Sequence, residues 1–172
     1  MTAQVRDRLS YDGRLFPLCS LPLQPWLRDT GNAGIFRWPH TANRRGYVAS
    51  WVISGDRLYL EKLEATLHDG SAASLATLFP GATGRIFAAS YSGTLRLTDG
   101  ELLEYVHLGF ASRYKRDIFL EIRDGVLVGM WVQENERPTS RATVKEDKAS
   151  YNRRGLVSRL AGAFRRSNLV GD

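Results

Sequence analysis

In the first 136 residues, short apolar runs alternate with Asp/Gly pairs, a pattern typical of β-hairpins. Residues 47–53 alternate between two faces, and the apolar run 58–60 begins just after Gly55-Asp56. Glycine accepts a positive φ without penalty and aspartate tolerates it, so this dipeptide suits a two-residue hairpin turn. The stretch therefore predicts an antiparallel hairpin.

Further strand-length runs flank three other dipeptides, namely Asp12-Gly13, Ser92-Gly93 and Asp124-Gly125. Asp99-Gly100 is also predicted to be a turn, because the apolar run 102–108 follows it. We count roughly eight to nine predicted strands, spaced as in a sandwich or a barrel. The expected fold class is all-β and mainly antiparallel: a barrel or two-sheet sandwich built from hairpins, with a short basic C-terminal helix.

Two segments of the body differ from this pattern. Residues 71–79 predict two helical turns that end at Pro80-Gly81. Residues 20–41 contain three prolines and three aromatic residues, Trp26, Phe36 and Trp38. Because proline removes a donor from the sheet ladder, this segment is predicted to be a long irregular connection that packs over the core.

The net charge of +6 comes entirely from the C-terminal part of the chain. Residues 1–136 hold 15 basic and 15 acidic residues, whereas residues 137–172 hold nine basic and three acidic residues. We therefore predict a β-rich globular domain over 1–136 and a basic tail over 137–172. The high pI gives no evidence for a basic groove on the globular domain.

Residues 153–168 of the tail predict a short amphipathic helix, capped by Asn152. Its candidate anion-binding residues are Arg153, Arg154, Arg159, Arg165 and Arg166. Three interpretations stay open. The helix docks on the body or on a partner, it lies on an anionic membrane surface, or its arginines neutralise nucleic-acid phosphates.

No cofactor is predicted for the chain. It lacks the glycine-rich motifs that bind nucleotides. The single Cys19 and three histidines far apart in sequence do not predict a metal site, and one cysteine excludes an internal disulfide. No apolar stretch approaches the roughly 20 residues of a membrane span, and the N-terminus has no apolar signal core. We therefore expect a cytoplasmic protein without a transmembrane segment.

The segment 105–121 is the richest in chemically active side chains. Its candidate ligand-binding residues are Tyr105, His107, Arg113, Tyr114 and Asp117. A tyrosine and a histidine on one strand face, beside basic groups, suit an anion. Ser112, His107 and Asp117 also match a catalytic triad by residue type, although no nucleophile elbow is present. The alternative, which we favour, is a hairpin whose polar loop only solvates a turn.

Trp38 and Arg45 are further candidates for ligand binding, in a second cluster that combines aromatic residues with arginine. Such pairs stack on bases or sugars. Aromatic residues on hairpins, however, normally form cross-strand core pairs. We therefore expect Trp51 and Trp131 in the core and Trp38 exposed on its loop.

Several stretches carry a resemblance: residues 9–15, 22–25, 45–53 and 58–60, then Tyr105-Val106-His107, and finally Tyr114, Asp117 and Glu121. Together they resemble a domain-of-unknown-function family of small bacterial β-rich proteins, over roughly residues 8–134 and without the tail. The family has no assigned activity. The resemblance implies a bacterial cytoplasmic domain and no particular reaction, and marks as positions of interest Trp51, Tyr105, His107, Tyr114 and Asp117.

A charge-balanced β domain without a catalytic motif fits a non-enzymatic binding or accessory protein that engages a protein partner, of the immunity or regulatory type. One alternative is a small-ligand binder or enzyme that uses the region of Tyr105, His107, Tyr114 and Asp117. Another is nucleic-acid attachment through the basic tail. The sequence leaves open whether the protein is an enzyme.

Overall fold

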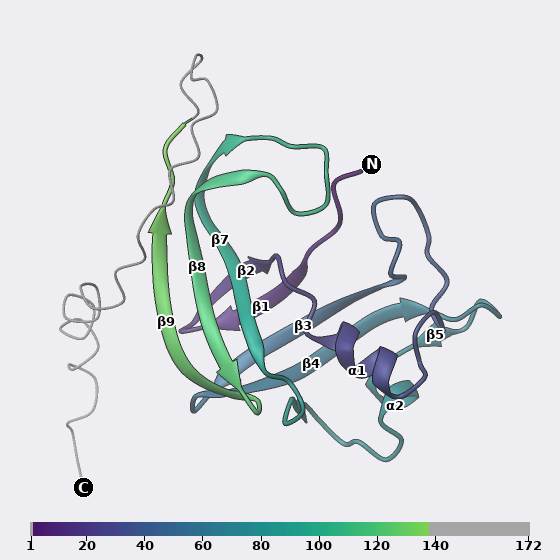
Figure 1. The fold of residues 1–172 in the computed structure, drawn as a ribbon. Coiled ribbons are helices and arrows are strands. Elements are labelled where there is room, and N and C mark those ends of the chain that lie inside the picture. The colour runs from purple at the N-terminus through teal and green to yellow at the C-terminus, as the bar shows by residue number, and fades with distance from the viewer. Residues whose placement is uncertain (1, 138–172) are drawn as a thin grey trace, which may run out of the picture. The chain divides into compact units, whose positions relative to one another are not determined.

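The computed structural model describes residues 2–137 (Figure 1). Strands make up most of its regular structure, and its two helices are short. The elements in chain order are β1 (Asp7–Tyr11), β2 (Arg14–Leu18), α1 (Leu23–Asp29), β3 (Tyr47–Ser54), β4 (Arg57–Thr66), β5 (Ala72–Ala73), α2 (Leu75–Leu78), β6 (Ile86–Phe87), β7 (Gly93–Glu104), β8 (Arg113–Arg123) and β9 (Val126–Glu134). The described residues are therefore mainly β, as the sequence predicts.

Three Asp/Gly pairs form the hairpin turns predicted for them. Asp12-Gly13 joins β1 to β2, Gly55-Asp56 joins β3 to β4, and Asp124-Gly125 joins β8 to β9. Both residues of each pair have a positive φ, between 49° and 77°, as a type I′ turn requires. These turns fix the pairing of six strands.

The strand pairings form a closed circuit within one sheet (Figure 1). The order is β3-β1-β2-β7-β8-β9-β4, and β4 pairs again with β3. Neighbours are antiparallel except β1 and β3, which pair in parallel. The register pairs only Leu18 with Leu97 between β2 and β7, and only Arg57 with Val126 between β4 and β9. The described residues thus form one sheet that returns to its first strand, as in a barrel.

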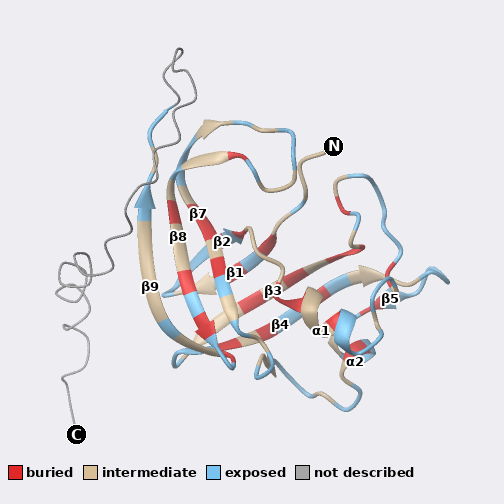
Figure 2. Ribbon diagram, viewed as in Figure 1, coloured by how far each residue is buried: buried red, intermediate tan, exposed pale blue. Residues whose placement is uncertain are grey.

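The core lies inside this closed sheet. Alternate strand positions point inward, and the fully buried leucines come from five different strands: Leu9, Leu18, Leu58, Leu95, Leu97 and Leu120. Figure 2 shows the buried parts of the strands as red bands separated by more exposed ones. Because each Å² of apolar surface removed from water contributes about 25 cal/mol, this alternation stabilises the closed sheet.

Two of the predicted turns are wrong. Ser92-Gly93 joins no hairpin, because β6 pairs with β4 instead of with β7. At Asp99-Gly100 the chain continues as β7, and a register shift against β8 absorbs the extra residues. The dipeptide therefore forms a bulge, in which Gly100 takes a φ of 80°. The predicted strand 102–108 ends early, since β7 stops at Glu104.

The proline-rich segment 20–41 contains a helix, which corrects the prediction of an irregular connection. Pro22 is the N-cap of α1 and Pro25 lies in its first turn, where backbone N–H groups have no partner inside a helix. Proline therefore costs nothing at these positions. The second helix, α2, lies within the predicted segment 71–79, and Ser74 caps it together with Thr77.

The predicted basic tail lies outside the described residues, apart from Arg137. This applies to the expected helix 153–168 and to its five candidate arginines, Arg153, Arg154, Arg159, Arg165 and Arg166. Between residues 2 and 137, no helix is long and apolar enough to cross a membrane.

Candidate ligand-binding pocket

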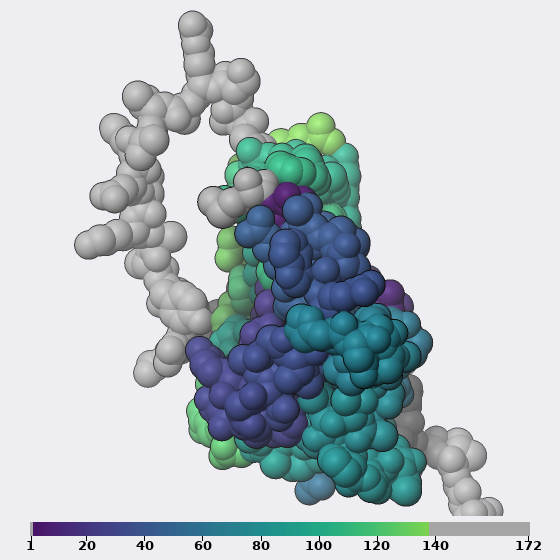
Figure 3. All heavy atoms as spheres, turned by 90° about the vertical axis from the view of Figure 1, so that its right-hand side faces the viewer, coloured from purple at the N-terminus to yellow at the C-terminus, as the bar shows by residue number. Residues whose placement is uncertain are grey.

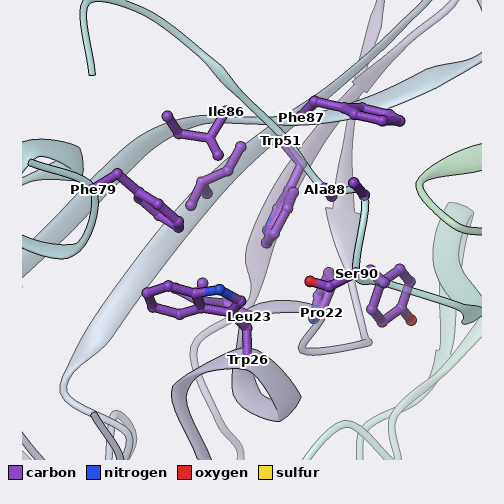
Figure 4. Close-up of a pocket in the computed structure, with 12 residues that line it drawn as sticks. Pro22, Leu23, Trp26, Trp51, Phe79, Ile86, Phe87, Ala88 and Ser90 are labelled. Atoms are coloured by element: carbon purple, nitrogen blue, oxygen red, sulfur yellow. The ribbon is translucent and has the colours of Figure 1, made fainter. Parts of the chain in front are cut away.

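A pocket of about 190 Å³ lies where α1 and the segments after α2 meet the closed sheet (Figure 4). Figure 3 shows the two covering regions side by side on this face: α1 in purple-blue, and the teal segments that include α2 and β6. The lining is mostly apolar and comes from Pro22, Leu23, Trp26, Trp51, Leu60, Phe79, Ile86, Phe87, Ala88, Ala89, Ser90 and Tyr91.

The first wall is the contact between α1 and the end of α2. Leu23 and Leu27 are buried and hold α1 against the sheet. This leaves Trp26 facing Phe79, with ring centroids 4.6 Å apart and planes tilted by 35°. Tilted aromatic pairs are attractive beyond their buried area. The packed side chains of Trp26 and Phe79 therefore form this wall of the pocket.

The floor of the pocket belongs to the sheet. Trp51 on β3 and Leu60 on β4 are direct partners in the strand register, and both are buried. The Trp51 indole N–H donates to Oδ2 of Asp7 over 3.5 Å. Because β1 pairs with β3 in parallel, with Leu9 opposite Trp51, Asp7 lies close enough to receive this bond. The floor is thus tied to a buried carboxylate.

That carboxylate belongs to a buried ion pair. Asp7 accepts from Nη2 of Arg45 at 2.8 Å and from the Ala49 N–H at 3.0 Å. Its side chain is fully buried, and that of Arg45 is only 6% exposed. Burial raises the pKa of the Asp7 carboxyl above its usual value, and the charge of Arg45 is the largest opposing influence. The pair anchors the N-terminal strand beside the pocket floor.

The third wall is the segment 86–91, held at both ends by backbone hydrogen bonds. The Ala88 N–H donates to the Leu58 carbonyl at 2.9 Å, and the Gly125 N–H donates to the Tyr91 carbonyl at 2.9 Å. Within the segment, the Tyr91 N–H closes a turn onto the Ala88 carbonyl. The wall is therefore fastened to β4 and to the β8–β9 turn, although these lie far apart in sequence.

The described residues that line this pocket include few polar side chains. Among the described residues that line it, Tyr91 is the one titratable residue, and burial raises the pKa of this phenol, which keeps it neutral. Ser90 adds a second hydroxyl. The pocket therefore offers mainly aromatic and aliphatic contact surfaces, and Ser90 and Tyr91 are the hydroxyl-bearing residues of its lining, which suits recognition of a largely apolar ligand.

The sequence-predicted pair Tyr105 and His107 lies elsewhere, on the loop between β7 and β8. The Tyr105 hydroxyl and Nδ1 of His107 are 3.0 Å apart. Both side chains are exposed, and Tyr105 retains 62% of its accessible surface. Neither residue lines the pocket.

The other candidates of this region make separate contacts. Asp117 is buried and accepts from Arg96 and from Asn135, both at 2.9 Å. The Tyr114 hydroxyl accepts from Arg6 at 3.0 Å, and Arg113 pairs with Glu104 at 3.6 Å. Of the three residues that match a triad by type, the Ser112 hydroxyl bonds to the backbone of Val106 and Asp117 bonds to Arg96. Among the described residues, no hydrogen bond joins either of them to His107.

The second predicted cluster divides between surface and core. Trp38 is 55% exposed, as expected, whereas Arg45 is buried in the ion pair with Asp7. Sequence reasoning missed the pocket residues Trp26, Phe79, Phe87 and Tyr91 as a group. The signal for Trp26 was present, since it is one of the aromatic residues of the proline-rich segment.

Comparison of the chain with family models, with curated proteins and with solved structures found no match. In the part of the chain that the structure describes, no group of three or more His, Cys, Asp or Glu side chains is placed to hold a metal ion. What the pocket binds is therefore inferred from the geometry of the pocket alone.

Proposed function

We propose that this protein is a non-enzymatic binding protein that holds a small, flat, largely apolar molecule in the pocket beside α1. The observation that carries the proposal is the set of aromatic side chains around one space, with Trp26 and Phe79 on one side and Trp51 beneath. Small-molecule sites in proteins are typically concave and apolar, with a few polar groups that orient the ligand.

The volume sets the size of the ligand. An apolar cavity of about 150 Å³ holds a benzene molecule, so a pocket of about 190 Å³ suits one ring or two fused rings. Ser90 and Tyr91 are the hydroxyl-bearing residues of the lining, so the ligand class includes molecules with one polar substituent. Indole and naphthol therefore represent the expected ligand class.

We expect indole and 2-naphthol to bind the wild-type chain with dissociation constants on the order of 10–100 μM, which ligands of about ten heavy atoms reach in good pockets. Trp26→Ala removes one aromatic wall and is expected to weaken binding at least about fivefold, since an aromatic contact contributes about 1 kcal/mol or more. Saturation-transfer NMR and isothermal titration calorimetry measure both quantities.

Trp38→Ala is the matched control, because Trp38 is exposed and does not line the pocket. It removes the same side chain and is expected to leave both dissociation constants unchanged. Equal weakening by the two variants, or a wild-type chain that binds neither compound at millimolar concentration, would contradict the proposal. Circular dichroism of each variant shows whether it is folded.

A further inference from the structure

Within residues 2–137, no strand pairs with the outer edge of β9 beyond the first residues of that strand. β4 reaches β9 only at the pair Arg57 and Val126, because the β3–β4 hairpin turns back at Gly55-Asp56. β9 continues to Glu134. In Figure 1 it is the outermost strand of the described chain on the left, with β8 on its inner side.

The polar groups of this open edge are identified by the register with β8. The Asn135 N–H donates to the Lys115 carbonyl at 2.8 Å. Antiparallel pairs alternate between bonded and non-bonded positions, and the register from Arg116–Glu134 to Leu120–Met130 is regular. Hence Met130, Val132 and Glu134 direct their backbone N–H and carbonyl groups away from β8, toward the open edge.

The sequence of β9 does not protect this edge. The open stretch 129–134 contains no proline and no lysine, and its one charged residue, Glu134, lies at the end of the strand. Natural edge strands are normally blunted by lysine, proline, bulges or covering segments. The one bulge of β9, at Val128, lies below the open stretch and leaves residues 129–134 regular. Within the described residues, a regular edge with this little protection is a template for another strand.

We propose that the occupant of this edge is the β9 strand of a second copy of this chain, paired antiparallel about a twofold axis at Val132. That register pairs outward-bonding residues with one another, Val132 with its equivalent and Met130 with Glu134 of the second copy. It places Trp131 opposite Gln133, so no like charges face each other. The self-complementarity of the strand is what favours a second copy over an unrelated segment.

The outer face next to the edge supports the same occupant. Phe119 on β8 and Trp131 on β9 stack with ring centroids 5.2 Å apart and planes within 12° of parallel. Both side chains remain partly exposed. In the proposed dimer, β7-β8-β9 of one copy continues into β9-β8-β7 of the other, and the two stacked aromatic pairs flank the seam. C2 symmetry is the commonest arrangement of homo-oligomers.

The test uses the full chain and its concentration dependence. Sedimentation velocity is expected to show a monomer–dimer equilibrium with a dissociation constant below about 100 μM, in the range of small, transient interfaces. Glu134→Pro removes one of the N–H groups that face the edge without removing a bond to β8, and it is expected to raise that constant at least tenfold. Glu136→Pro, beyond the end of β9, is the matched control and is expected to leave it unchanged.

Hydrogen exchange of the wild-type chain gives an answer even if Glu134→Pro fails to fold. The Met130, Val132 and Glu134 amides are expected to become more protected as the protein concentration rises. A monomer at 500 μM with fast exchange at these three amides overturns the proposal. So does protection that is independent of concentration and disappears when residues 139–172 are removed, because the chain's own tail would then cover the edge.

Discussion

Replacing Arg45 with methionine is expected to lower the free energy of unfolding by about 3–5 kcal/mol at pH 7, the usual cost of leaving one buried charge without its partner. Methionine keeps most of the side-chain volume, so the loss reflects the missing charge on the Asp7 carboxylate. Two hydrogen bonds are lost with it, to Asp7 and to the Val5 carbonyl. Urea unfolding followed by tryptophan fluorescence measures the change.

The pH dependence of this loss identifies its cause. Burial already raises the folded-state pKa of Asp7 above its ordinary value of 3.8, and Arg45 opposes that rise. Without Arg45 the folded-state pKa moves further up. A carboxyl whose pKa is higher in the folded than in the unfolded state loses stability as the pH rises. The loss in free energy of unfolding caused by Arg45→Met is therefore expected to be smallest near pH 4 and to grow toward pH 7.

Arg8→Met is the control for this prediction. Arg8 lies on the same strand as Asp7 and pairs with Glu64 at 3.0 Å, but both side chains are more than 40% exposed. Exposed ion pairs contribute about 0–1 kcal/mol. A loss for the Arg45 variant that equals the control, or that does not change between pH 4 and pH 7, would show that the buried ion pair does not stabilise the sheet.

Gly125→Ala is expected to destabilise the protein by about 3 kcal/mol or more, from a strained backbone and a steric clash together. Gly125 has a φ of 77°, and a Cβ there would lie 2.7 Å from the Ala88 carbonyl oxygen and 2.7 Å from the Phe87 ring. Both neighbours belong to the third wall of the pocket. The variant is therefore expected to bind indole more weakly as well.

Gly13→Ala separates the two causes. Gly13 occupies the same position in the β1–β2 turn, with a φ of 69°, and no atom lies within 4 Å of the place that an alanine Cβ would take. Only the backbone strain applies, so we expect a loss of about 1–2 kcal/mol. Thermal unfolding of both variants checks the difference. Equal losses would mean that the segment 86–91 moves freely away from the turn and is not fixed by it.

Local signals explain which turns the sequence could predict. Asp12-Gly13 and Asp124-Gly125 succeed because both residues of a type I′ turn need positive φ, a requirement visible in the dipeptide itself. Ser92-Gly93 has similar residues, yet the run before it pairs with β4. That choice depends on a strand more than 25 residues away, and short-range patterns carry no information about it.

The sequence could not predict the pocket either, because long-range strand pairing brings its lining residues together. Its lining comes from α1, β3, β4 and the segment 79–91, and only the closed sheet brings them together. The sequence predicts that Trp26 belongs to a packed cover, but its partner Phe79 lies at the end of another helix. Tyr105 and His107 stand out in the sequence because their side chains are chemically active. In the structure they lie on an exposed loop, where they hydrogen-bond to each other.

The closure of the sheet has a consequence for how the chain is made. β4 ends at residue 66, yet it pairs with β9 through Val126. This residue, which closes the sheet, leaves the ribosome 60 residues later. Until the β8–β9 turn emerges, the segment 86–91 lacks one of its two anchors. The domain therefore cannot acquire its native topology during synthesis of its first two thirds, and folding is expected to be a late, all-or-none event dominated by long-range contacts.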